Sequence, residues 1–249
     1  MTTAPVPTRF SFRRIFPVLW LIALVTLAAL TFQPAATGVS RWATLGLIVA
    51  VTITALCFIW KWRGIRLPTL GGISLICGTM AIPWKIKASP DALRDQVVQH
   101  LQAFDGCEYY WGGESRGGID CSGLIRRGMI DACLSEGLRN FDLGLMRHGL
   151  SLWWNDTSAE ALGMEHAGLT KRLSDAPSIH SLDHKNLVPG DIAVTAGGGH
   201  ILAYLGNETW IEADPGEGKV VTLHAPTSPN PWLKMKVWLL RWTILMDQS

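Results

Sequence analysis

The stretch that decides the fold lies at residues 109–132, YYWGGESRGGIDCSGLIRRGMIDA. Its glycine-rich first half predicts a loop, and the apolar residues that follow Cys121 at helical spacing predict a helix over residues 121–132. Asp120 stands directly before this helix, where an aspartate caps free backbone N–H groups. A cysteine in the first turn faces those N–H groups and the positive end of the helix dipole, and both favour a thiolate. Cys121 is therefore the candidate nucleophile.

A second informative stretch lies at residues 187–214, LVPGDIAVTAGGGHILAYLGNETWIEAD. Turn residues divide it into short apolar runs, which predict antiparallel strands. The predicted strands are residues 192–195, 200–205 and 209–213, and the last two form a hairpin through Gly206 and Asn207.

Pairing about this turn brings His200 beside Glu212 or its immediate neighbours. A carboxylate that contacts the imidazole fixes its tautomer and stabilises the imidazolium formed when the histidine takes the thiol proton. The register depends on one turn, and Asp214, which shares a strand face with Glu212, is the competing candidate. The predicted catalytic residues are Cys121, His200 and Glu212.

Taken in order, the motifs Y-x-W-G-G, D-C-S-G-L, P-G-D and G-x-H-x-x-x-Y-x-G-N resemble those of the NlpC-type family of papain-like bacterial cell-wall cysteine peptidases, across residues 91–224. The resemblance implies an α+β fold with a papain-like core, in which the helix that bears Cys121 packs on an antiparallel sheet that carries His200. It also implies a cysteine hydrolase without a cofactor, which cleaves amide bonds in peptidoglycan stem peptides through an acyl-enzyme.

The same resemblance implies roles for single residues. The third catalytic residue falls twelve positions after His200, at Glu212, where the family often has a histidine. The hydroxyl of Tyr109 is placed near the nucleophile, and Asp120 and Ser122 line the pocket that binds the acyl side of the peptide. Backbone N–H groups at the helix start would bind the oxyanion.

Apolar stretches before this region predict a membrane anchor over residues 1–87. The predicted transmembrane helices are residues 15–32, 42–60 and, interrupted by prolines and glycines, 67–84. Basic residues lie before the first span and after the second, which places the amino terminus in the cytoplasm. With a third crossing, the hydrolase domain at residues 88–249 lies on the outer face of the bacterial inner membrane; with two, it faces the cytoplasm. A cleaved signal peptide is the alternative for the first span, and the second span that follows favours a retained anchor.

Composition agrees with this division. The 249 residues are 48% hydrophobic with a formal net charge of +2, which is apolar for a soluble chain and lacks the basic run of a nucleic-acid-binding protein. The five cysteines include no C-x-x-C pair, and the odd set of three in the polar half, Cys107, Cys121 and Cys133, argues against a disulfide framework and leaves room for one reactive thiol. A bridge between Cys107 and Cys133 is the alternative.

Cys121 and His200 are further apart in the sequence than the resemblance to the NlpC-type family leads us to expect, which implies an insertion over residues 134–182. His180 and His184 have an i, i+4 spacing, but no carboxylate or cysteine lies nearby in zinc-site spacing, so no metal site is predicted.

Other functions stay open at this level. A papain-like acyltransferase or thiol hydrolase that acts on a lipid or lipoprotein would suit a membrane anchor, and an interbacterial cell-wall-degrading toxin would use the apolar segments for delivery. A silent binding module is disfavoured, because a cysteine and a histidine are both present. The expected partner is a peptidoglycan stem peptide or its lipid-linked precursor.

Overall fold

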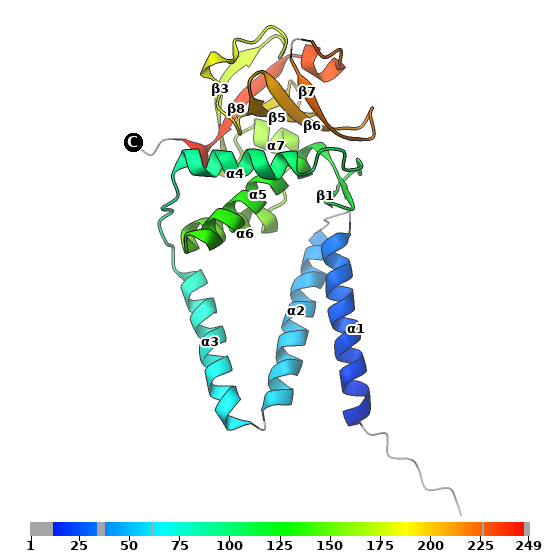
Figure 1. Ribbon diagram of the computed structural model, residues 1–249, viewed down its shortest axis with the longest axis vertical. Coiled ribbons are helices and arrows are strands. Elements are labelled where there is room, and N and C mark those ends of the chain that lie inside the picture. The colour runs from blue at the N-terminus through cyan, green and yellow to red at the C-terminus, as the bar shows by residue number, and fades with distance from the viewer. Residues whose placement is uncertain (1–11, 34–37, 61, 226, 247–249) are drawn as a thin grey trace, which may run out of the picture.

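The computed structural model describes residues 12–33, 38–60, 62–225 and 227–246. Three helices extend from one side of a compact α+β unit (Figure 1). They are α1 (Phe12–Phe32), α2 (Gly38–Ile59) and α3 (Arg63–Ala81). The carboxyl ends of α1 and α3 and the amino end of α2 all lie toward the α+β unit (Figure 1). These three helices, α1, α2 and α3, are here called the stalk. The chain passes along the stalk three times.

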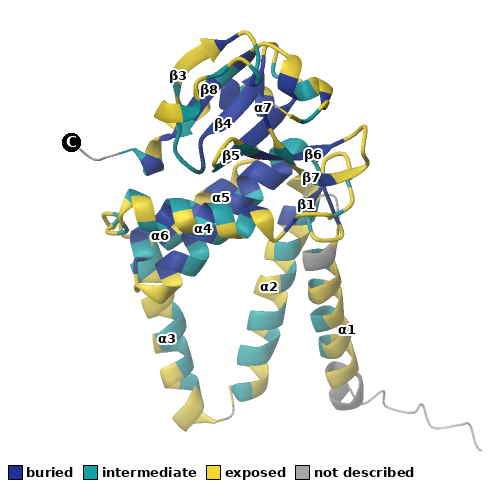
Figure 2. Cartoon of the chain, turned by 45° about the horizontal axis from the view of Figure 1, so that its top comes forward, coloured by how far each residue is buried: buried dark blue, intermediate teal, exposed yellow. Residues whose placement is uncertain are grey.

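The predicted spans at residues 15–32, 42–60 and 67–84 coincide with these helices, and the third begins and ends earlier than predicted. By length and composition, α2 is the one described helix that could cross a membrane. The apolar part of α1 that the structure describes, Pro17–Leu30, is shorter. No described residue of α3 is buried, and Arg41 is the one buried residue of α2. Many large apolar residues of the three helices are exposed, among them Leu21, Phe58 and Leu75. Figure 2 shows that exposed and partly buried residues make up most of the three helices.

The α+β unit places helices against one antiparallel sheet, as the predicted fold class requires. Its helices are α4 (Pro90–Gln102), α5 (Cys121–Arg139), α6 (Leu143–Trp154) and α7 (Ala159–Gly163). The sheet has the order β3 (Thr170–Ala176), β8 (Val237–Trp242), β4 (Ile192–Thr195), β5 (Ile201–Gly206), β6 (Thr209–Asp214) and β7 (Lys219–His224). A separate ribbon pairs β1 (Glu114–Ser115) with β2 (Gly118–Ile119).

Helix α5 is the centre of the core, and it continues to Arg139, about two turns beyond the predicted segment. Leu124 and Met129 of α5 are fully buried, and α5 contacts β5 and β6. Ile201 and Ile211 of those strands belong to the same apolar cluster. Burying so much apolar surface fixes α5, and with it Cys121, against the sheet.

The stretch predicted as an insertion, residues 134–182, contains α6, α7 and β3. Strand β3 pairs with β8 and forms one edge of the sheet, so this stretch is built into the core of the unit. The strand continues to Ala176, which pairs with Val237 of β8.

Asp142 joins the stalk to the α+β unit. One carboxylate oxygen caps α6 by accepting the N–H of Leu145 at 3.0 Å, and the other accepts the N–H groups of Lys87 and Ala88 at 2.6 and 3.0 Å. Burial acts to raise the pKa of this carboxyl, but its backbone N–H donors outweigh burial and hold the pKa below its ordinary value. The segment that follows α3 is thus fixed to the start of α6.

Candidate active site

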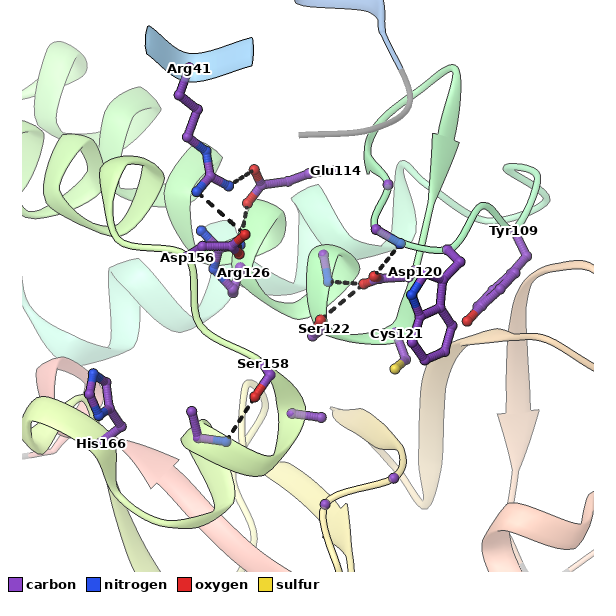
Figure 3. A pocket seen from close by; sticks show the side chains of 18 residues that line it. Arg41, Tyr109, Glu114, Asp120, Cys121, Ser122, Arg126, Asp156, Ser158 and His166 are labelled. Atoms are coloured by element: carbon purple, nitrogen blue, oxygen red, sulfur yellow. Dashed lines mark hydrogen bonds and ion pairs between the residues drawn. The ribbon is translucent and has the colours of Figure 1, made fainter. Parts of the chain in front are cut away.

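Cys121 is the first residue of α5, and it lines a pocket of about 600 Å³ (Figure 3). The helix begins here because Asp120 caps it: one oxygen of its carboxylate accepts the N–H of Gly123 at 2.6 Å and the hydroxyl of Ser122 at 3.0 Å. A β-carbon at Gly123 would collide with the carbonyl oxygen of Gly113. In the D-C-S-G motif, Asp120 therefore caps the helix, Cys121 is the candidate nucleophile, and Gly123 allows the backbone of Gly113 to approach closely.

The Y-x-W-G-G loop is held against this helix start. The N–H of Gly112 donates to the second carboxylate oxygen of Asp120 at 2.8 Å, and the N–H of Asp120 donates to the carbonyl of Gly113 at 3.1 Å. Gly112 has a φ of +73°, which a residue with a side chain rarely adopts. The two motifs form one rigid rim, with Tyr109 and Trp111 along the pocket (Figure 3).

The thiol of Cys121 is a weak acid in this setting. Burial raises its pKa to about 12, and the neighbouring Asp120 carboxylate acts in the same direction. The backbone N–H groups of Ser122, Ile201 and Cys121 itself point at the sulfur and lower the pKa, but burial outweighs them. The expected donors at the helix start are present, whereas the expected thiolate is not favoured. Nucleophilic attack therefore needs a base.

His200 lies directly before β5, almost fully buried, and its Nε2 forms a 2.5 Å hydrogen bond with Oε2 of Glu212. The next residue, Ile201, directs its N–H at the sulfur of Cys121, so the polypeptide that carries the histidine lies against the nucleophile. Nε2 is occupied by Glu212, which leaves Nδ1 as the nitrogen for proton transfer. Within the described residues, no hydrogen bond joins Cys121 to His200.

Glu212 reaches His200 although the hairpin differs from the predicted one. The turn consists of Asn207 and Glu208, both with positive φ, and a bulge between Tyr204 and Gly206 shifts the register. The strands then pair Ala203 with Ile211. Extended further, this register sets Asp214 opposite His200 and Glu212 two residues away on the same face, within reach of a long side chain.

The carboxylates at 212 and 214 are joined by a residue that the sequence analysis missed. The Nδ2 group of Asn230 donates to Oε1 of Glu212 and to Oδ2 of Asp214, both at 2.8 Å. Burial raises the pKa of Glu212, while the hydrogen bonds from His200 and Asn230 act to lower it. Asp214 therefore supports Glu212 through Asn230 and does not contact the imidazole.

Trp232 is a second missed residue. Its ring stacks on the imidazole of His200, with ring centroids 4.1 Å apart and an interplanar angle of 20°. Its indole N–H donates to Oδ1 of Asp214 at 3.4 Å. No motif spacing relates Trp232 to His200, because the contact depends on how the chain folds back after β7.

Replacing Trp232 with alanine should lower kcat roughly two- to tenfold, the range that corresponds to the ~0.5–1.5 kcal/mol of an aromatic contact. The ring restrains the imidazole and covers one of its faces, so its loss loosens the histidine and admits water. Trp232→Phe keeps the stacking and should remain near wild-type activity. Steady-state kinetics of the two variants will check this, and equal losses in both would show that the indole N–H matters more than the stacked ring.

The predicted substrate-binding residues Tyr109, Asp120 and Ser122 all line the pocket beside Cys121. Burial raises the pKa of the Tyr109 hydroxyl to about 12, with further contributions from Cys121 and Asp120. The phenol therefore stays protonated and can donate a hydrogen bond. The Asp120 carboxylate already accepts three hydrogen bonds from the protein, so its first role here is structural.

The histidines of the region predicted as an insertion do not converge. His166 lines the pocket, His180 bonds the carbonyl of Ser228, and His184 accepts the indole N–H of Trp210. Within the described ranges, no three histidine, cysteine, aspartate or glutamate side chains are placed to hold a metal ion. All five cysteines are free thiols.

Comparison with known proteins finds similarity at the level of solved structures. No protein-family model and no curated protein matches the chain. NlpC1 from Trichomonas vaginalis is 18% identical over 65% of this chain and 47% of its own, with a TM-score of 0.40. The P60 domain of an antigen from M. avium subspecies paratuberculosis is 21% identical over 64% of this chain and 98% of its own, also at 0.40. The peptidoglycan hydrolase RipB from Mycobacterium tuberculosis is 19% identical over 76% and 84%, at 0.37.

This chain spans about half the length of NlpC1 and of NlpC2, both from Trichomonas vaginalis: 47% and 51%. The solved structures that it resembles thus include NlpC/P60 proteins and peptidoglycan hydrolases. At this level of similarity, the function proposed for the chain depends on its own site residues.

Proposed function

We propose that this chain is a membrane-anchored cysteine hydrolase that cleaves amide bonds in peptidoglycan stem peptides. The observation that carries the proposal is the placement of the Cys121 thiol: it lines a pocket, at a helix start, against the strand that brings in the His200–Glu212 pair. A thiol, a base and an orienting carboxylate are the groups that nucleophilic catalysis requires. The four sequence motifs that resemble the NlpC-type family point to the same chemistry and supply the substrate class.

In this mechanism, Nδ1 of His200 takes the thiol proton, and Glu212 stabilises the resulting imidazolium through Nε2. The thiolate forms a bond to the carbonyl carbon of the scissile amide, and the negative charge moves to the oxygen. Backbone N–H groups at the start of α5 and the Tyr109 hydroxyl are the candidate donors to that oxyanion. The tetrahedral adduct expels the amine, which takes the proton from His200, and leaves a thioester on Cys121. Water, deprotonated by His200, then releases the carboxylic acid and the free thiol.

The character of the pocket favours a peptide over an acyl chain. Its lining includes the charged side chains of Arg41, Glu114, Asp120, Arg126 and Asp156. An extended hydrocarbon chain would remove these polar groups further from water and offer them no hydrogen bond in return, which is costly. A stem peptide carries amides and carboxylates that can hydrogen-bond there. The lipid or lipoprotein substrates of the alternative acyltransferase suit this lining less well.

The test is digestion of purified muropeptides and lipid-linked precursors by the full chain, with the products identified by mass. A gain of one water across a single amide bond is the expected result, and it identifies the bond cut. Release or transfer of a fatty acyl group from a lipoprotein, without amide cleavage, would instead establish the acyltransferase alternative.

We also propose that α1, α2 and α3 cross the inner membrane, so that the hydrolase domain at residues 88–249 lies outside the cytoplasm. By length and composition, α2 meets the requirement for a crossing by itself among the described helices. The exposed apolar side chains of α1 and α3 and the three passes of the chain support the other two crossings. With an odd number of crossings, the amino terminus and the hydrolase domain lie on opposite sides of the membrane. The basic residues near the amino terminus favour the cytoplasm for that end.

A reporter fused after Ser249 should therefore work only outside the cytoplasm. Alkaline phosphatase at this position should be active, and a fluorescent protein that matures only in the cytoplasm should stay dark. The two fusions report opposite locations, so each is the control for the other. A fluorescent fusion with an inactive phosphatase would reject the third crossing.

A further inference from the structure

One wall of the pocket comes from the stalk. Arg41, in the first turn of α2, is 4% exposed and lines the same pocket as Cys121 (Figure 3). Its Nη2 lies 2.9 Å from Oε2 of Glu114, and its Nη1 lies 3.6 Å from Oδ2 of Asp156. A guanidinium in the first turn of a helix faces the positive end of the helix dipole, which is unfavourable. The two carboxylates of the hydrolase domain offset this cost.

Arg126 of α5 binds the same two carboxylates from the other side. Its Nη1 lies 2.9 Å from Oε1 of Glu114 and 2.6 Å from Oδ1 of Asp156. Arg41, Glu114, Arg126 and Asp156, here called the charge cluster, thus combine two positive and two negative charges. Three of its members are buried and Asp156 is exposed, so the buried charges are compensated mainly by one another.

A second contact fixes the amino end of α2 at this place. The ring of Trp42 meets that of Trp154, at the end of α6, edge to face with centroids 4.8 Å apart. Trp154 lies two residues before Asp156. Two successive residues of α2 therefore hold the same short segment of the hydrolase domain, one by its ring and one by its charge.

The charge cluster connects to the nucleophile by a short series of contacts. Glu114 follows Gly112 and Gly113 directly, and these two glycines hold Asp120 through the bonds described above. Asp120 in turn caps the helix that begins at Cys121. A change in the position of Glu114 would therefore move the rim of the pocket that carries Tyr109 and Trp111.

We propose that Arg41 is a positioning residue of the active site: the stalk supplies it, and through Glu114 and Asp156 it holds the pocket in the shape that binds substrate. The stalk then has two roles, as an anchor and as part of the pocket. This inference rests on the proposed hydrolase function, whose substrate the pocket would receive.

The test compares full-length variants in the same detergent or membrane. Arg41→Gln keeps hydrogen-bond donors but removes the charge, and it should raise KM about tenfold, as expected for coupled residues in one ion-pair network, with little change in kcat. Arg41→Lys restores the charge without the two-pronged geometry and should lie between. Arg63→Gln, at the exposed far end of the stalk, removes a charge that does not line the pocket and should behave as wild type.

A double variant that restores the balance of charges gives a more specific test. Arg41→Gln leaves one carboxylate in excess, and adding Asp156→Asn restores equal numbers, so the double variant should have a KM closer to that of the wild type than Arg41→Gln alone. If the substitution only caused a fraction of the molecules to unfold, less enzyme would be active, so the apparent kcat would fall and KM would be unchanged. That signature, or an unchanged KM in Arg41→Gln, would overturn the inference.

A substrate-free measurement separates this inference from the proposed function. Alkylation of Cys121 by iodoacetamide, followed by mass, should be faster in Arg41→Gln than in the wild type and in Arg63→Gln, because the rim over the thiol is less restrained. A wild-type chain that hydrolyses no offered peptide would refute the proposed function, and the alkylation rates would still decide the role of Arg41. Equal rates in the three proteins would refute that role.

Discussion

Replacing Cys121 with alanine is expected to abolish hydrolysis, with a loss on the order of 10⁴-fold or more, because its thiol is the group that forms the covalent intermediate. The fold should survive. The side chain is only partly buried, and Asp120, the cap of α5, stays in place. Cys121→Ser should be as inactive, since a serine hydroxyl is a far weaker acid than a thiol and His200 faces the harder proton transfer.

Cys107→Ser is the matched control for this experiment. Cys107 is also a partly buried free thiol near the start of the Y-x-W-G-G loop, but its sulfur bonds the carbonyl of Arg116 and does not line the pocket. Its serine variant should keep its turnover. Normal hydrolysis by Cys121→Ala, or loss of hydrolysis in Cys107→Ser alone, would remove Cys121 from the mechanism.

Replacing Glu212 with alanine should lower kcat by about 10² to 10⁴, the range seen when the residue that orients a catalytic histidine is lost. The substitution removes the acceptor for Nε2 of His200 and for Nδ2 of Asn230, which frees the imidazole to rotate. It also leaves buried donors unpaired, at about 1–3 kcal/mol each, so thermal unfolding must be measured alongside turnover. Glu212→Gln retains an acceptor oxygen and should lose less on both measures.

Asp214→Ala is the paired comparison, because Asp214 is the other carboxylate on this face of β6. It holds Asn230 and the N–H of Gly216 and does not reach the imidazole, so its loss should be mild. The decisive measurement is turnover of Glu212→Ala, Glu212→Gln and Asp214→Ala on one substrate. An active Glu212→Ala beside an inactive Asp214→Ala would transfer the orienting role two residues along the strand.

Local signals predicted the elements of the site that short-range chemistry determines. Asp120 before an apolar helical pattern located the start of α5, and the turn residues around residues 192–195 located β4 with the bounds that the structure has. The register of the hairpin was harder to predict, because the shift caused by its turn and the shift caused by its bulge act in opposite directions. The predicted turn at Gly206 and Asn207 lies one residue early, and the bulge at Tyr204 keeps Glu212 within reach of His200.

Residues that reach the site from distant segments could not be predicted from the local sequence. Asn230 and Trp232 lie in a loop whose return to the sheet depends on tertiary packing, and nothing in their local sequence indicates a histidine as their neighbour. Arg41 is a similar case, since by sequence it is a lone charge between two apolar stretches and indicates only topology. Its burial against Glu114 follows from how α2 meets the hydrolase domain, a contact between residues 73 positions apart.

The charge cluster bears on what would follow if a protease separated the two parts of the chain. A fragment that begins at Lys85 would retain Cys121, His200 and Glu212 and would look complete by its motifs. In this fragment, Glu114 would contact Arg126 but would lack the guanidinium of Arg41, which pairs with its other carboxylate oxygen in the full chain. An under-compensated buried carboxylate either takes up a proton or pushes its loop apart, and the pocket rim follows that loop. If the stalk is the proposed membrane anchor, cleavage after it would therefore lower the activity of the released fragment.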